Sequence, residues 1–305
     1  MTTRPEESTG APVGSATGDA EAVPRRRRLP GARVLADGAV IYLWGEIALA
    51  LGFYAVYSAV RNSNQGGTAT ALRNAENLIS TQRFLGLYHE QTLQAWALHF
   101  RPLVIGANYY YGSLHFVVTI GCLVFLFVRW RDDYPFWRNT LGISTAIALI
   151  GFTFWPLMPP RLLPHSFGFV DTLARYPTFW SFKQAAVNQI SNQYAAMPSV
   201  HCVWAMWCAC VLVPRLRSRW AKVVAVAYPV LTVVAIVLTA NHYFLDAVGG
   251  FAVLLLGFEA SRRFTRAGRG ARPSPLPVGV TDSPETDTPE TDTPETDTPE
   301  TDATG

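Results

Sequence analysis

Charged residues are scarce in this sequence of 305 residues: Asp, Glu, Lys and Arg together make up 15% of it. Soluble globular domains usually contain about 25% of such residues. Hydrophobic residues account for 50% of the chain, and many of them gather in uninterrupted apolar runs. The scarcity of charge argues against an ordinary soluble domain, and the apolar runs indicate a polytopic membrane protein.

Cysteine is also rare, and all four cysteines lie inside apolar runs: Cys122, Cys202, Cys208 and Cys210. No Cys-x-x-Cys pair and no Cys/His spacing typical of a zinc site occurs. No cluster of acidic residues that would bind a metal ion is visible either. The sequence therefore predicts no disulfide, no metal site and no cofactor, and we interpret the cysteines as small apolar residues in helix packing.

The two ends of the chain lack long apolar runs and are predicted to be disordered. Residues 1–33 finish in the cluster Arg25–Arg28, which we interpret as a membrane-flanking anchor rather than a nucleic-acid contact. Residues 261–305 start as a basic juxtamembrane segment and end in an acidic Thr-Asp-Thr-Pro-Glu repeat that cannot form a core. A six-helix membrane domain is expected between them, at 34–260. The small net charge of +3 hides the opposite charges of these segments.

Between the two ends, six apolar runs predict an all-α polytopic membrane protein with six transmembrane helices. The first run is longer than a signal-peptide core and indicates a retained signal anchor, although Ala48-Leu49-Ala50 leaves cleavage as the alternative. Residues 61–107 mix polar and apolar residues at helical spacing, which predicts one or two amphipathic helices at the membrane interface. The six predicted spans are 34–60, 108–128, 140–157, 197–213, 223–240 and 242–258.

Polar side chains inside the predicted spans need a partner, because burying them in a membrane is costly. Glu46 in the first span is expected either to form a structural pair or to contact a substrate, and the sequence leaves both open. His115 lies well inside the second span, and we interpret it as a buried structural histidine before a site residue. The tyrosines at 109–111, which open this span, are typical of an interfacial aromatic belt.

Short arginine-rich segments orient the predicted helices, because positive charge in short loops marks the cytoplasmic side. With six crossings, four such segments fall on one side: the cluster at Arg25, the loops 129–138 and 214–222, and the arginines from Arg262 onward. Both termini are then cytoplasmic. Arg161, His201 and His242 all fall at the opposite, extracytoplasmic face, where they can form one site.

Two histidine segments at this outer face carry the chemistry. In Asn-His-Tyr-Phe-Leu-Asp, His242 and Asp246 are four residues apart, so on a helix the carboxylate can reach the imidazole. A carboxylate-oriented histidine is typical of a nucleophile or a base. In Ala-Ala-Met-Pro-Ser-Val-His, Pro198 and Ser199 precede a helix and His201 lies in its first turn, where amides attract an anion. Together the two segments indicate phosphate ester chemistry.

The expected roles follow from phosphoryl transfer, which depends on positioning and charge stabilisation. His242 is predicted to be the nucleophile, Asp246 to fix its tautomer, and His201 to donate a proton to the leaving oxygen. The phosphate oxygens are expected to bind around the same helix end, with an arginine as the main cation. The predicted phosphate-binding residues are Arg161, Ser199 and Asn241, with Lys183 and Arg175 as weaker candidates in a loop.

The segments ending at His201 (Ala-Met-Pro-Ser-Val-His) and at Asp246 (Asn-His-Tyr-Phe-Leu-Asp) resemble the second and third signature motifs of the type 2 phosphatidic-acid phosphatase superfamily. The Met-Pro-Ser form, with His-Tyr in the other motif, is most similar to the branch of inositol phosphorylceramide synthases, which are inositolphosphotransferases. The resemblance covers roughly residues 40–260. It implies six helices and a phosphohistidine on His242, with Asp246 as its partner and His201 as the acid.

Three departures separate the chain from the hydrolases of that superfamily. The hydrolases carry an arginine shortly before the nucleophilic histidine, where this chain has apolar residues such as Val237. They also carry a lysine where Phe154 stands, so that only Arg161 and its neighbouring prolines remain of the first motif. Val200 replaces the glycine that usually precedes the acid histidine. These departures favour the synthase-like branch over the plain phosphatases.

The expected function is an integral membrane phosphotransferase or phosphatase whose substrate is a phospholipid or a polyprenyl phosphate. An acceptor alcohol, such as inositol or a lipid hydroxyl, makes it a transferase. Water as acceptor makes it a plain lipid phosphatase of the phosphatidic-acid or polyprenyl-pyrophosphate type. A non-catalytic lipid-binding or transport protein is the alternative from another class. Vanadate-dependent haloperoxidases share the histidines, but they resemble soluble helical proteins.

Overall fold

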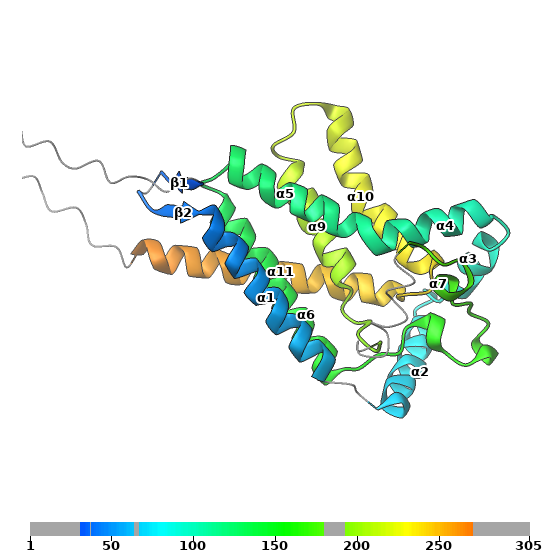
Figure 1. Ribbon diagram of the computed structural model, residues 1–305. Helices are drawn as coiled ribbons and strands as arrows, with labels where there is room; N and C mark the ends of the chain where they lie inside the picture. The colour runs from blue at the N-terminus through cyan, green and yellow to red at the C-terminus, as the bar shows by residue number, and fades with distance from the viewer. Residues whose placement is uncertain (1–30, 37, 64–66, 180–192, 271–305) are drawn as a thin grey trace, which may run out of the picture.

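Helices dominate the computed structural model, as predicted, and they form an elongated bundle (Figure 1). The structure describes residues 31–36, 38–63, 67–179 and 193–270. The predicted acidic repeat and nearly all of the predicted basic arm lie outside these ranges.

A short hairpin precedes the first helix. Strands β1 (Ala32–Val34) and β2 (Val40–Tyr42) pair antiparallel, and Gly38 in the turn between them has a φ of +81°. An Asp-Gly pair between two short apolar runs is a strong hairpin signal. The prediction that the first helical span begins at residue 34 was therefore wrong, because helix α1 is Leu43–Ser63.

Among the residues that the structure describes, four helical segments are long and apolar enough to cross a membrane, by length and composition. The second of them is a continuous rod in which α4 (Arg101–Tyr109), the π-helix η1 (Tyr110–Leu114) and α5 (His115–Arg129) join end to end. Its predicted start at residue 108 was about two turns late. The four segments are Leu43–Val60 of α1, Arg101–Arg129, Arg219–Leu238 (α10) and Phe244–Arg266 of α11, whose full range is Phe244–Gly270.

The other two predicted spans are helices that do not meet this criterion. Helix α6 is Tyr134–Phe154 and has 21 residues, whereas helix α9 is Val200–Leu212 and has only 13. A helix of 13 residues is about 20 Å long, and the hydrocarbon core of a bilayer is about 30 Å thick. The structure thus supports four of the six predicted spans directly.

Smaller helices gather at one end of the bundle, on the right in Figure 1. Two of them, α2 and α3, lie between residues 61 and 107, where one or two amphipathic helices were predicted. The others belong to the connection that follows α6. These elements are α2 (Thr68–Phe84), α3 (Glu90–Ala97), η2 (Pro160–Leu162), η3 (His165–Phe167) and α7 (Thr172–Arg175).

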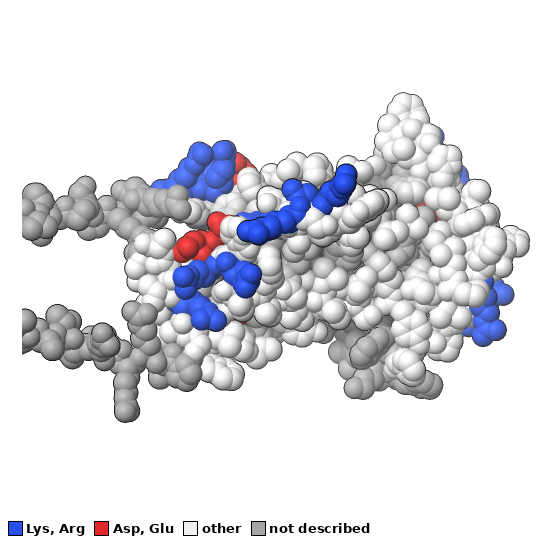
Figure 2. All heavy atoms as spheres, turned by 90° about the horizontal axis from the view of Figure 1, so that it is seen from above, with Lys and Arg blue, Asp and Glu red and all other residues white. Residues whose placement is uncertain are grey.

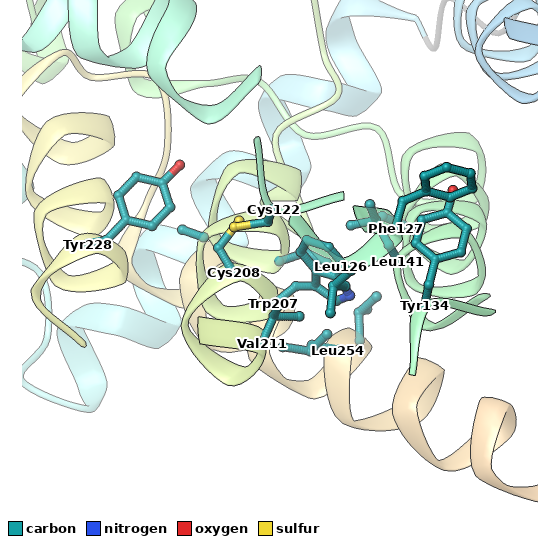
Figure 3. Packing of buried hydrophobic residues seen from close by; sticks show 14 of the residues in the cluster. Cys122, Leu126, Phe127, Tyr134, Leu141, Trp207, Cys208, Val211, Tyr228 and Leu254 are labelled. Atoms are coloured by element: carbon teal, nitrogen blue, oxygen red, sulfur yellow. The ribbon is translucent and has the colours of Figure 1, made fainter. Parts of the chain in front are cut away.

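The largest core cluster joins α5, α6, α9 and α11, and Figure 3 shows it from close by. Trp207 of α9 is fully buried there, and its indole nitrogen donates to a backbone carbonyl of α6. Cys122 and Cys208 pack in the same cluster as free thiols. Helices α6 and α11 approach closely because Gly257 faces Ser144, and a Cβ at the glycine would overlap the serine. The packing fixes α9, which carries His201, against both helices.

Arginine-rich segments that are far apart in the sequence meet at one end of the bundle. Arg215, after α9, pairs with Asp133, just before α6. The neighbouring Asp132 accepts a hydrogen bond from the backbone of the hairpin. Phe258 of α11 packs edge-on against Phe136 near the start of α6. On the face that Figure 2 shows, most of the visible Lys and Arg side chains lie in the half of the molecule that holds the C-terminal part of α11, with a smaller group at the opposite end.

Candidate active site

His242 lies in the tight connection between α10 and α11, where only residues 239–243 separate the two helices. Ala240 in this connection has a φ of +52°, a left-handed conformation that residues other than glycine rarely adopt. The sharp reversal brings the imidazole against the carbonyl group of Ala196, just ahead of α9. The two histidine segments of the sequence therefore meet.

The contacts of the His242 ring fix its tautomer. Nδ1 lies 2.9 Å from the carbonyl oxygen of Ala196 and 3.2 Å from Oδ2 of Asp246. A carbonyl oxygen and a carboxylate oxygen only accept hydrogen bonds, so Nδ1 carries the proton and Nε2 carries the lone pair. Asp246 is fully buried, and its Oδ2 also accepts a hydrogen bond from the amide of Tyr243 at 2.9 Å. The contact predicted from helical spacing is present, although His242 itself precedes the first residue of α11.

Ser199 joins the two motifs at the amino end of α9. Its hydroxyl is the N-cap of this helix and accepts a hydrogen bond from the amide of Cys202 at 3.5 Å. Its own amide donates to the backbone carbonyl of Asp246 at 3.0 Å. Because Ser199 is fully buried, its side chain stabilises the helix start on which His201 stands.

Two glycines let the turn before α9 pack closely between α6 and α11. A Cβ at Gly151 would lie 2.7 Å from Pro198, and a Cβ at Gly250 would lie 2.8 Å from the carbonyl oxygen of Ser199. Both distances are shorter than van der Waals contact, so any larger residue would displace the turn. The position of His201 relative to α11 therefore depends on these two glycines, which have no side chain.

Two further rings surround the histidine pair. The centroids of the His201 and His242 rings are 5.5 Å apart. Tyr111 stacks on His201 at 4.4 Å with an interplanar angle of 25°, and it lies 6.4 Å from His242. His115 meets His201 edge-on at 4.3 Å. Tyr111 was predicted to be interfacial and His115 to be structural, and their position beside the histidine pair was not predicted.

The π-helix η1 contains Tyr111 and immediately precedes His115. Its wider turns interrupt the α-helical bonding of the rod, and Nδ1 of His115 donates to the carbonyl group of Tyr111 at 3.1 Å. Single π-helical turns inside α-helices are frequent at functional sites. The sequence carries only a weak sign of it, the small pair Gly112 and Ser113 in an otherwise apolar run.

Arg161 reaches the same region from η2. Its Nε donates to Oδ1 of Asn241 at 3.0 Å, and its Nη1 donates to Oδ2 of Asp171 at 3.0 Å. Its amide donates to the carbonyl of Ala240 at 2.8 Å, which ties η2 to the residues that precede His242. Asp171, which also caps α7, was not predicted as part of this group. Within the described ranges Nη2 makes no hydrogen bond, so this edge of the guanidinium is available to a ligand.

Two of the candidates that the sequence left open, Arg175 and Glu46, make other contacts in the structure. Arg175 is exposed at the end of α7, and its guanidinium lies over the ring of Tyr176. Glu46 forms an ion pair with Arg138 near the start of α6, which agrees with the structural-pair alternative. Lys183 lies outside the described residues. Among those that are described, no group of three or more His, Cys, Asp or Glu side chains is placed to hold a metal ion.

A cavity of about 1250 Å³ opens onto the part of the candidate site that holds Arg161 and His201. Its lining includes Tyr111, His115, Arg161, Asp171 and His201. The volume exceeds the range of about 300–1,000 Å³ that is usual for sites of small ligands. The remaining lining comes mainly from α1, α5, α6 and α9, so the cavity has room for a ligand with a long apolar part.

Two buried polar side chains from α2 and α3 hold the start of α11. Oε1 of Glu90 accepts a hydrogen bond from the amide of Phe244 at 2.9 Å, and Oε1 of Gln82 accepts one from the amide of Leu245 at 3.0 Å. Gln82 also donates to Glu90, and both side chains are fully buried. The first amides of a helix have no intrahelical acceptor, and a carboxylate there meets the positive end of the helix dipole. These two residues, which were not predicted, therefore set the position of α11.

Replacing Glu90 by alanine is expected to lower the midpoint of thermal unfolding in detergent. The change leaves the amide of Phe244 and the side-chain amide of Gln82 buried without an acceptor, at a cost of about 1–3 kcal/mol for each group. Glu90→Gln keeps an acceptor oxygen and should lower the midpoint less. Glu76→Ala, on the exposed face of α2, is the matched control and should leave it unchanged. Equal midpoints for Glu90→Ala and the control would contradict the capping role.

The sequence matches a model of a known protein family. The family model described as PAP2 superfamily matches residues 76–260, more than half of the chain, including both histidines and Arg161. The chain belongs to the PAP2 superfamily. Membership supports a membrane enzyme of the phosphatase type that acts on lipid phosphates. No curated protein and no solved structure matches the chain.

Proposed function

We propose that this PAP2 superfamily protein is an integral membrane phosphotransferase or phosphatase that acts on a lipid phosphate ester through a phosphohistidine. The observation that supports it best is the buried pair of His242 and Asp246. Because this contact uses Nδ1, Nε2 is the nitrogen that can react. The centroids of the His242 and His201 rings are 5.5 Å apart. A phosphoryl group bound between the two rings has a nucleophile on one side and a proton donor on the other. Residues 34–260 are the catalytic domain in this proposal.

The reaction has two steps. Nε2 of His242 attacks phosphorus, so that an N–P bond forms and the P–O bond to the lipid breaks. His201 gives its proton to the departing oxygen, while Asp246 stabilises the positive charge on the other imidazole. His201 then takes a proton from the acceptor, whose oxygen attacks phosphorus and breaks the N–P bond. Water as acceptor yields free phosphate, and an alcohol yields a new phosphate ester.

Arg161 supplies positive charge to the phosphate oxygens through Nη2. Its bonds to Asn241 and Asp171 hold the planar guanidinium in one orientation, which favours recognition of a tetrahedral phosphate. Asn241 acts by orienting this arginine. The amino end of α9, capped by Ser199, adds the positive end of its helix dipole.

The site faces the extracytoplasmic side in this proposal, and both termini are cytoplasmic. The meeting of arginine-rich segments near Arg215 and Asp133, at the end of α9 opposite to His201, supports this orientation, because short basic loops favour the cytoplasm. It requires α6 and α9 to cross the membrane together with the four segments Leu43–Val60, Arg101–Arg129, Arg219–Leu238 and Phe244–Arg266, which gives six crossings.

Transfer to an alcohol, as in an inositol phosphorylceramide synthase, is the finer form of the proposal. The Met-Pro-Ser form of the His201 motif and the apolar residues around Val237 support it. The alternative is a plain phosphatase for phosphatidic acid or a polyprenyl pyrophosphate. A second alternative is a lipid-binding or transport protein that uses the same cavity without turnover.

Purified protein supplied with a panel of lipid phosphates in the presence of a chelator tests the proposal. We expect release of free phosphate or, when inositol or another alcohol is added, a new phospholipid detected by mass spectrometry. Release without the alcohol product supports the phosphatase, and the new lipid supports the transferase. Lipid binding with neither product, whatever acceptor is added, would refute the enzymatic proposal and favour the binding protein.

A further inference from the structure

The cavity that begins at His201 also reaches a polar cluster inside the bundle. Its lining includes Glu46, Tyr134 and Arg138, which lie far from either histidine motif in the sequence. Along α1 the lining runs from Glu46 to Ser58, a stretch of about 18 Å of helix. The cavity is therefore long as well as large.

Helix directions place this polar cluster at the end of the bundle opposite to His201. Helices α1 and α6 both begin there, since Glu46 in the first turn of α1 pairs with Arg138 near the start of α6. Helix α9 runs the other way: His201 is in its first turn, and Arg215 beyond its last turn pairs with Asp133 just before α6. A ligand with its phosphate at His201 thus points its other end toward the cluster.

Between its two ends the cavity is lined mainly by apolar and aromatic side chains. Such a lining favours a hydrocarbon chain, because contact with it removes the chain from water. The head of the ligand is then a phosphate ester and its body is an apolar chain. Lining residues of this middle part are Leu49, Phe53, Phe116, Ile120, Leu123 and Leu141.

An ion pair and several hydrogen bonds hold the side chains of the polar cluster together. Arg138 pairs with Oε1 of Glu46, and the hydroxyl of Tyr134 donates to Oε2 of the same carboxylate at 3.0 Å. Two further nitrogens of Arg138 donate to Oδ1 of Asn139, at 3.1 and 2.9 Å. A hydrocarbon end pressed against this ion pair removes water from the charges and returns no hydrogen bond, which is unfavourable.

We propose that Glu46, Tyr134 and Arg138 form the floor of a chain-binding cavity and set the longest lipid chain that the protein accepts. This inference rests on the proposed function for the identity of the ligand, a phosphate ester with an apolar chain. A chain that ends above the floor gains apolar contact with every added methylene. A longer chain must either meet the ion pair or lift the phosphate from the site.

Gly142 provides a direct test, because it lines the cavity on α6 one turn beyond Arg138. A Cβ at this position would meet nothing within 4 Å, so a side chain can extend into the cavity without displacing the backbone. Gly142→Leu should shorten the cavity by up to one turn, about 5.4 Å. We expect it to weaken binding of the longest accepted chain about tenfold relative to binding of a short chain.

Two matched changes complete the series. Gly121→Leu on α5 is the control, since its Cβ also has open space but the residue does not line the cavity. It should leave chain-length preference unchanged. The double change Glu46→Leu with Arg138→Met replaces the ion pair by apolar side chains, which is tolerated in many proteins. It should shift the preference toward longer chains, opposite to Gly142→Leu.

Binding of alkyl phosphates, from octyl to octadecyl phosphate, gives a readout that does not depend on turnover. Thermal stabilisation of the wild-type protein in nanodiscs should rise with chain length and then fall. The maximum should move to shorter chains in Gly142→Leu and to longer chains in the double variant. A maximum at the same chain length in both variants would refute the proposal that these three residues limit chain length. If the maxima move but no lipid phosphate is turned over, the floor stands and the proposed enzymatic function fails.

Discussion

Alanine in place of His242 should reduce turnover of every lipid phosphate that the wild-type protein uses by at least about 10⁴-fold. The change removes Nε2, the atom proposed to form the N–P bond. It also leaves the buried carboxylate of Asp246 without the ring that it orients. Initial rates of phosphate release or of lipid product formation measure the effect.

His165→Ala is the matched control, because this histidine is exposed in η3 and does not line the cavity. It should keep full activity. A substrate with a labelled phosphoryl group should leave acid-labile, base-stable label on the wild-type protein and on the control but not on the His242→Ala variant. Turnover that survives in His242→Ala would rule out the phosphohistidine mechanism.

Replacing Arg161 by lysine is expected to lower kcat/KM by about 10²-fold, although the charge is kept. A lysine has one nitrogen at its tip, so it cannot hold Asn241 and Asp171 and still present a fixed donor to phosphate. Arg161→Ala should lower kcat/KM further, because it also leaves the carboxylate of Asp171 without its partner. Steady-state kinetics with one lipid phosphate separate the effects on kcat and KM.

Arg175→Lys controls for loss of guanidinium chemistry as such, since this arginine is exposed at the end of α7. It should change kcat/KM by less than a factor of about two. If Arg161→Lys behaved like this control, another cation would have to bind the phosphate, and the proposed role of the Asn241–Arg161–Asp171 group would fail.

The helices could be predicted from the sequence because long apolar runs have few alternatives in a membrane protein. The hairpin before α1 was missed, since a criterion based on hydropathy merges the apolar strand Val40–Tyr42 with the helix that follows. The length of α9 was overestimated for a related reason. Its apolar residues extend toward Met197, but the helix begins at Val200, after the Pro-Ser turn.

The central contact of the candidate site could also be predicted, because His242 and Asp246 are neighbours in the chain and local spacing limits how far apart they can lie. Sequence spacing does not reveal Tyr111 and His115 in the same way. They come from a helical rod more than eighty residues away, and the packing of this rod against α9 brings them to His201.

The sequence by itself determined that the protein is built of apolar helices, that its basic residues gather in a few short segments, and that it carries two histidine motifs. Each of these depends only on local composition or on a spacing of a few residues. Tertiary structure alone supplied the second acceptor for the Nδ1 proton of His242, the carbonyl oxygen of Ala196, which is distant in the chain. It also decided that Glu90 caps α11 and that Glu46 and Arg138 close the far end of the cavity. These contacts join residues far apart in the chain, and only packing brings such residues together.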